Sequence, residues 1–91
     1  MAVTVLHDPA QRRFYTEVDG VLALLDYRID QDHLVIAHTG VPDAIGGRGI
    51  ASDLVRAAFD YARQTGLKVR PACSYAAAWV ERHPEYNEQL G

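Results

Sequence analysis

Three residues carry side chains that could move protons or an acyl group: Cys73, Tyr75 and His38. Cys73 comes just before a segment expected to be helical. The partial positive charge at a helix N-terminus favours a thiolate, which could take up a group and pass it on. The alternative is a small buried packing residue, because free cysteine is among the most buried residue types. Both interpretations of Cys73 stay open.

Tyr75 and His38 are candidates for acid–base roles. Tyr75 could donate its phenolic proton to a leaving group, or it could simply pack at the start of a helix. His38 is expected near the end of a central strand, on the same face as Leu34 and Ile36. A neutral imidazole there could act as a general base, and a hydrogen-bonded structural histidine is the alternative.

A glycine cluster, Gly46, Gly47 and Gly49, stands directly before the clearest helical pattern of the chain. The first N–H groups of a helix are unpaired and carry partial positive charge, and glycine lets an anion approach the backbone. Arg48 adds a full charge at the same place. The spacing matches neither the P-loop nor the dinucleotide fingerprint. The cluster therefore indicates either a phosphate-binding turn or a tight turn without a ligand.

The segment before this cluster predicts an antiparallel sheet. Two runs of alternating apolar residues between Arg12 and Ile29 are joined by Asp19-Gly20, which is typical of a two-residue hairpin turn. A third run, His33 to Val41, has apolar residues on both faces and predicts a central, covered strand. A short strand over Ala2 to Leu6 is expected before the hairpin.

The segment after the cluster predicts a helix, a strand and a second helix. Apolar residues recur at helical spacing from Ile50 until Gly66. Leu67 to Pro71 is expected to pair in parallel with the third run, with regular pairing failing near Pro71. Ser74 is expected to cap a short helix from Tyr75 to about His83. These elements predict an α+β fold with a mixed sheet, one long helix and one short helix.

Composition predicts one compact domain spanning residues 1–91, with a net charge of −3 that argues against nucleic acid as a partner. We expect no membrane span, because no apolar run approaches about 20 residues, and no signal peptide. A single cysteine fits a reducing cytoplasm. No spacing of His, Cys and carboxylates is typical of a metal site, and His33 and His83 are expected at the surface. A homodimer through an exposed apolar edge stays open.

The glycine cluster resembles a known motif. Gly46 to Ala51 reads GGRGIA, which is similar to the (Gln/Arg)-x-x-Gly-x-(Gly/Ala) motif of the GNAT acetyltransferase superfamily. Gly49 and Ala51 match this motif, and Gly46 departs from it. The stretches HTGVPDAIGGRGIA and KVRPACSYAAAWVERHPEY resemble a compact, single-domain branch of N-acetyltransferases, and the resemblance covers Phe14 to Leu90.

The resemblance implies a GNAT-like fold that uses acetyl-CoA to acetylate an unidentified amine. It implies that backbone from Ile45 to Ala51 holds the pyrophosphate and that the end of the central strand pairs with the pantetheine arm. The strand ending at Ala72-Cys73 would splay away, and Tyr75 lies close to the place where many family members have a tyrosine that protonates the leaving thiolate. The possible role of His38 as the base for the amine rests on its expected position alone, not on the resemblance. The implied cofactor contacts are Thr39, Gly40, Val41, Gly46, Gly47, Arg48, Gly49, Ile50 and Ala51.

Two departures from the family pattern keep other functions in view. Many members of this branch carry a larger residue, often Glu, where this chain has Gly40, and the family usually has Gln or Arg where it has Gly46. The alternatives are a CoA-binding module without useful catalysis and an interaction domain that has lost the cofactor. Binding of CoA separates these two alternatives.

Overall fold

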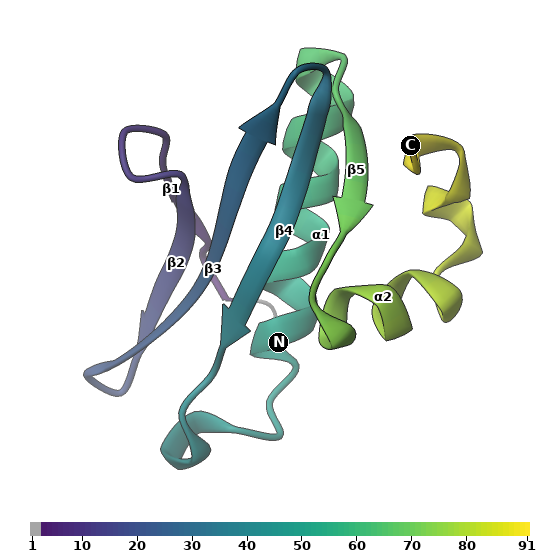
Figure 1. Cartoon of the computed structure of the whole chain (residues 1–91). Coiled ribbons are helices and arrows are strands. Elements are labelled where there is room, and N and C mark those ends of the chain that lie inside the picture. The colour runs from purple at the N-terminus through teal and green to yellow at the C-terminus, as the bar shows by residue number, and fades with distance from the viewer. Residues whose placement is uncertain (1–2) are drawn as a thin grey trace.

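Four antiparallel strands open the chain, each paired with its neighbour in sequence (Figure 1). They are β1 (Leu6–Asp8), β2 (Arg13–Val18), β3 (Val21–Asp30) and β4 (His33–Gly40). The computed structural model describes residues 3–91. The β2–β3 turn has positive φ at both Asp19 (53°) and Gly20 (75°), which is the geometry that two-residue hairpins require. The hairpin predicted from Asp19-Gly20 is therefore confirmed.

A crossover helix then returns the chain to the sheet. After a short 3-10 turn, η1 (Asp43–Ile45), helix α1 (Ile50–Thr65) ends at Gly66, whose φ is 76°. Strand β5 (Lys68–Pro71) pairs in parallel with β4 and completes a sheet of order β1-β2-β3-β4-β5. Helix α2 (Ser74–Glu81) and the 3-10 helix η2 (Pro84–Gln89) follow. The predicted α+β architecture with a mixed sheet is confirmed.

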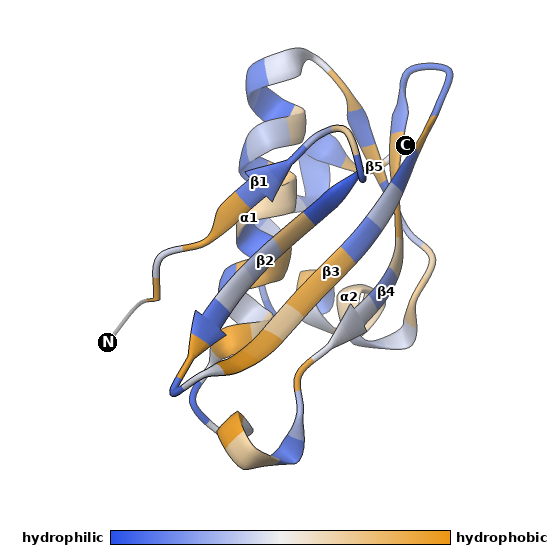
Figure 2. Cartoon of the chain, turned by 90° about the vertical axis from the view of Figure 1, so that its left-hand side faces the viewer, coloured by the Kyte–Doolittle hydropathy of each residue, from blue (hydrophilic) through white to orange (hydrophobic). Residues whose placement is uncertain are grey.

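Both helices pack together on one face of the sheet. Helix α1 buries a face that includes Leu54, Phe59 and Ala62. Trp79 of α2 stacks on Phe59 with ring centroids 5.3 Å apart, and its indole N–H donates to Ser52 Oγ at 2.8 Å. Figure 2 shows that α1 and α2 lie behind the strands and that no helix crosses in front of β2 and β3. The sheet thus has a covered face and a helix-free face.

A β-bulge in β4 changes which face its last residues occupy. Tyr27 pairs with Ile36 and Asp26 pairs with His38, so Ala37 is an extra residue in β4. The expectation that His38 shares a face with Leu34 and Ile36 is therefore wrong. Ile36 is fully buried, whereas His38 is exposed on the helix-free face. The same shift turns Thr39, which pairs with buried Leu25, toward the core.

Three smaller expectations also need correction. The first strand covers Leu6–Asp8 rather than Ala2 to Leu6, and Ala2 itself lies outside the described residues. Cys73, not Ser74, is the N-cap of α2, because its Sγ accepts the N–H of Ala76 at 3.4 Å. His83 is half-buried rather than on the surface, since its ring stacks on Trp79 at 4.0 Å. His33 is likewise half-buried beside Asp32.

Candidate functional site

The glycine cluster forms the turn between η1 and α1. Gly47 and Gly49 have φ of 75° and 76°, a left-handed conformation that glycine adopts at little cost. A Cβ at either position would meet no atom within 4 Å, so the space beside this backbone is open. Gly46 differs, because its φ of −69° suits any residue and a Cβ would make only ordinary contact with Asp43 O at 3.4 Å. Conformation thus favours glycine at two of the three positions.

The start of α1 presents unpaired backbone donors to that open space. The first bond within the helix runs from Asp53 N–H to Gly49 C=O at 3.1 Å. Within residues 3–91, the N–H groups of Ile50, Ala51 and Ser52 have no acceptor, and the N-cap Gly49 has no side chain to supply one. Such N–H groups, together with the helix dipole, attract anions. The arrangement is chemically suited to a phosphate group.

Arg48 does not stand free beside these donors. Its Nη1 lies 2.8 Å from Asp19 Oδ2, so the guanidinium reaches across to the β2–β3 turn. Both side chains are well exposed, at 49% and 70% of their side-chain surface. An exposed pair of this kind is weak and exchangeable. The positive charge predicted for the loop is therefore present, but it is shared with the hairpin.

Strands β4 and β5 separate next to this loop. Their pairing ends at Ile36 and Pro71, where the N–H groups of Ala72 and Cys73 both donate to Ile36 C=O, at 3.0 and 3.1 Å. The pairing of β4 with β3 continues as far as Gly40. In the described part of the chain, residues 37–40 therefore have a strand on one edge only. The expectation that regular pairing fails near Pro71 is confirmed, and the free edge opens beside the start of α1 (Figure 1).

Thr39 and Cys73 face each other where the two strands part. Thr39 Oγ1 and Cys73 Sγ are 3.6 Å apart, and both residues are half-buried. The same sulfur accepts the Ala76 N–H as the cap of α2. The fold thus brings together two of the residues singled out from the sequence. Cys73 holds the end of a helix while lining the gap between the strands.

Tyr75 lies half-buried against the core. Burial raises the pKa of its phenol, Arg82 opposes the rise, and Asp53 in the first turn of α1 adds to it. A phenol is already protonated near neutral pH at its usual pKa, and the rise strengthens that preference, so the hydroxyl is in the form that can donate a proton.

His38 lies on the opposite face of β4 from Thr39. Its ring leans along the strand over Gly40, where a Cβ would come within 3.1 Å of His38 Nε2. His38 and Gly40 line an open hollow on the helix-free face together with Leu22, Leu24, Val41 and Pro42. The predicted site residues therefore form two groups, one on each face of the sheet, separated by the free edge of β4.

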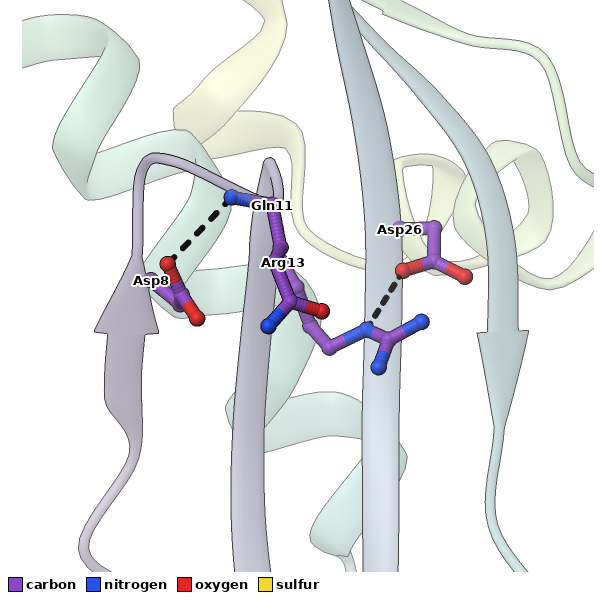
Figure 3. A network of polar contacts seen from close by, with 4 residues as sticks. All are labelled: Asp8, Gln11, Arg13 and Asp26. Carbon is purple, nitrogen blue, oxygen red and sulfur yellow. Dashed lines mark hydrogen bonds and ion pairs between the residues drawn. The ribbon is translucent and has the colours of Figure 1, made fainter.

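An acidic and basic row on the helix-free face was not anticipated from the sequence. Asp26 pairs in register with Arg13 on one side and with His38 on the other. Figure 3 shows Arg13 reaching across to Asp26, with Nε and Oδ1 2.8 Å apart. Nearby, Asp8 Oδ1 accepts the backbone N–H of Gln11 at 3.2 Å. Strand alternation places Arg13 and Asp26 on one face, but the bulge that adds His38 to the row has no sequence signal.

Membrane insertion and metal binding find no support in residues 3–91. No helix there has the length and apolar character needed to cross a membrane. Over the same residues, no three His, Cys, Asp or Glu side chains are grouped so that they could hold a metal ion.

Comparison with known proteins places the chain in a family. The family model described as GCN5-related N-acetyl-transferase matches residues 13–90. The solution structure of a GCN5-like protein from Staphylococcus aureus is similar, with a TM-score of 0.78 and 30% identity, covering 98% of this chain and 88% of that one.

Curated vertebrate proteins are also similar over nearly the whole chain. Protein NATD1 of Homo sapiens is 37% identical over 93 residues, covering 97% of this chain and 82% of that protein. Protein NATD1 of Xenopus tropicalis is 34% identical over 95 residues, covering 98% of this chain and 86% of the relative. Since the family model covers most of the sequence, this chain belongs to the GCN5-related N-acetyltransferase (GNAT) family.

Proposed function

We propose that this chain transfers the acetyl group of acetyl-CoA to an amine. The observation that carries the proposal is the juxtaposition of an open, donor-rich loop with the half-paired end of β4. The loop supplies positive potential for phosphates, and the free strand edge supplies backbone groups for an extended, amide-containing arm. Family membership makes acetyl-CoA the ligand to test first.

The residues present fit such a ligand. Backbone of Gly47 and Gly49 and the N–H groups of Ile50 and Ala51 would hold the pyrophosphate, with Arg48 nearby as a mobile charge. The β4 edge at Thr39, Gly40 and Val41 would orient the pantetheine arm. Bound acetyl-CoA supplies the thioester whose carbonyl carbon the amine nitrogen attacks. Holding the two reactants in line would provide much of the rate enhancement.

Proton movements are assigned to two side chains. His38 Nε2 takes a proton from the amine, because the ring is exposed and His38 lies in the part of β4 that has no β5 partner. Tyr75 gives its proton to the departing thiolate as the carbon–sulfur bond breaks and the carbon–nitrogen bond forms. Cys73 lines the gap and holds α2 without taking the acetyl group itself.

The proposal is tested by calorimetric titration with CoA and acetyl-CoA. Gly49→Ala would put a methyl group into the open space beside the α1 donors, so we expect about tenfold weaker CoA binding. Gly66→Ala is the matched control, because Gly66 has the same φ of 76°, also meets no atom within 4 Å, and lies at the other end of α1. Both variants carry a similar backbone strain of roughly 1 kcal/mol or more.

The outcomes separate the proposal from its alternatives. Weaker binding in Gly49→Ala but not in Gly66→Ala supports a phosphate loop. CoA binding without acetyl transfer to any amine would favour a cofactor-binding module. A folded wild-type protein that binds neither CoA nor acetyl-CoA would overturn the proposal and leave the interaction domain as the leading function.

A further inference from the structure

The helix-free face carries an apolar row that crosses three strands. Leu6 of β1, Tyr15 of β2 and Leu24 of β3 pair in register, and Leu22 lies beside the row on β3. Figure 2 shows this part of β3 in orange, next to the β2–β3 turn and uncovered by any helix. Leu6 is 49% exposed and Leu22 is 44% exposed. An apolar patch of this kind with charged residues at its rim is typical of a surface that binds another protein.

Two side chains of opposite charge flank this row on β2. Arg13 lies two residues before Tyr15 and Glu17 two residues after it, so strand alternation puts all three on the same face. Glu17 is exposed and forms no ion pair within residues 3–91. Arg13 donates through Nε to Asp26 (Figure 3), and its two Nη groups have no acceptor in the same described range. Both charges can therefore bind a further partner.

A hollow beside Arg13 has room for a carboxylate from outside the chain. Its volume is about 250 Å³, and its lining consists of Asp8, Gln11, Arg13, Tyr15 and Leu22. Asp8 in this lining already accepts the backbone N–H of Gln11 at 3.2 Å. The free Nη groups of Arg13 can hold an incoming carboxylate through two parallel N–H···O bonds. Glu17 of the same chain is about 13 Å away along the strand, so the carboxylate must come from another molecule.

A second copy of the chain presents that carboxylate when a two-fold axis runs along the apolar row. Rotation about this axis reverses the strand direction, so Arg13 of each copy comes opposite Glu17 of the other, and the contact occurs twice. A two-fold axis along β2 would instead place Arg13 opposite Arg13 and Glu17 opposite Glu17. The charges therefore select the first arrangement, in which the two sheets stack about 10 Å apart with their strands within about 30° of each other.

The charges farther along β3 fit the same arrangement. Arg28 is exposed on this face, four residues after Leu24, and the Asp19-Gly20 turn ends four residues before Leu24. The two-fold rotation therefore brings Arg28 opposite the turn of the other copy, where Asp19 carries a carboxylate. Asp30, at the end of β3, lies 3.8 Å from Arg70 of its own chain. The basic and acidic groups of this face thus complement those of a second copy.

We propose that two copies of this chain associate through their helix-free faces, with the apolar row on the two-fold axis and Arg13 of each copy bonded to Glu17 of the other. Each guanidinium then lies between Asp26 of its own chain and Glu17 of the other, and its five N–H donors can serve both carboxylates. His38 lies two strands from β2, toward the margin of the interface. Association of the two copies does not depend on the proposed acetyl transfer.

Sedimentation velocity of the full chain tests the interface. From about 10 to 500 µM, the wild type should shift from the mass of one chain toward the mass of two, and about 0.5 M NaCl should weaken this association. Glu17→Arg should weaken it at least about tenfold, because two pairs of like charge then replace two pairs of opposite charge. Glu88→Arg is the matched control, since it makes the same change in net charge at an exposed position of η2.

A charge exchange tests the pairing itself. Arg13→Glu alone should weaken association as Glu17→Arg does, and near-UV circular dichroism checks that each variant is folded. The double variant Arg13→Glu/Glu17→Arg should recover association, because each contact again joins a glutamate to an arginine. Recovery is specific to the proposed axis, since the axis along β2 would still stack like charges on each other.

Each outcome supports or overturns this interface. A wild type that stays monomeric across the whole concentration range would overturn it and leave the helix-free face to a partner of another kind. Equal association of Glu17→Arg and Glu88→Arg would also overturn it, because the charge at residue 17 would then have no special place. This comparison decides the matter even if Arg13→Glu does not fold. A folded double variant that stays as weak as its two parents would overturn the pairing of Arg13 with Glu17.

Discussion

Cys73 combines two roles at the residue scale. Its sulfur caps α2 through the Ala76 N–H and lies 3.6 Å from Thr39 Oγ1 at the point where β4 and β5 separate. A sulfur that accepts a hydrogen bond from a helix terminus is a weak version of the oxygen caps that helices prefer. The structural role alone accounts for a small polarisable residue at this position.

The Cys73→Ser substitution distinguishes a structural role of the sulfur from a catalytic one. Serine is a preferred N-cap, so Cys73→Ser should keep or slightly raise the free energy of unfolding, whereas Cys73→Ala should lower it by about 1 kcal/mol. Urea unfolding measures both changes. Acetyl transfer by Cys73→Ser should stay within about threefold of the wild type, since direct attack by the amine needs no thiol. Loss of transfer in a folded Cys73→Ser protein would identify the sulfur as a nucleophile.

At the scale of elements, turn residues and periodicity predicted the arrangement well. Asp19-Gly20 fixed the hairpin because few sequences tolerate two positive φ values in succession. Helical spacing up to Gly66 predicted α1, and the following apolar run predicted a parallel β5. These signals are local: each depends on a short stretch of sequence and not on tertiary contacts.

The features that the sequence did not predict depend on how strands pair in register and on which distant residues the fold brings together. One extra residue at Ala37 moves His38 to the helix-free face, and no residue type is diagnostic of such a bulge. Arg48 pairs with Asp19 across 29 positions of sequence, which only the folded hairpin brings together. The predicted loop residues form one continuous turn, whereas the three predicted acid–base and nucleophilic residues occupy two faces of the sheet. Local patterns predicted the candidate residues, and tertiary register decided on which face of the sheet each of them lies.

The ion pair between Arg48 of the glycine turn and Asp19 of the hairpin is expected to lower the affinity for CoA. Asp19 holds Arg48 and places a negative charge near the proposed phosphate site. Asp19→Asn keeps a residue suited to positive φ and releases the guanidinium, so CoA affinity should rise about two- to fivefold at low salt. Glu88→Gln makes the same change in net charge at an exposed position of η2 and should leave CoA affinity unchanged. Equal calorimetric affinities for Asp19→Asn and the wild type would assign Arg48 no part in CoA binding.

At the scale of the whole molecule, β1 is fastened to the rest of the fold by an aromatic cluster. The His7 ring stacks on Phe14 at 4.1 Å and meets Tyr61 edge-on at 4.4 Å. His7 Nε2 lies 2.6 Å from Tyr27 Oη. Burial lowers the pKa of His7, while the neighbouring carboxylate of Asp8 opposes that fall. The cluster therefore stabilises the neutral form of the imidazole.

This preference makes stability depend on pH. Because burial holds the pKa of His7 in the folded protein below the usual histidine value of about 6.5, the unfolded chain takes up a proton first as the pH falls. The contribution is present above about pH 6.5 and is lost as the pH drops through the folded pKa. Urea unfolding at pH 7.5 and 5.5 should show a larger loss for the wild type than for His7→Gln. Equal losses in both proteins would exclude His7 as the source.

The bulge at Ala37 determines which side chains of β4 face the helices on either side of it. Upstream of it, even-numbered side chains such as Leu34 and Ile36 face the helices, and downstream of it Thr39 does so instead. Insertion or deletion of one residue near this point would exchange the two sides of the strand end without altering its composition. Two homologues with the bulge at different positions therefore place residues that align in sequence on opposite faces of the strand. A functional role at residues 38–40 should therefore be assigned from a homologue by superposing the two structures rather than by aligning the two sequences.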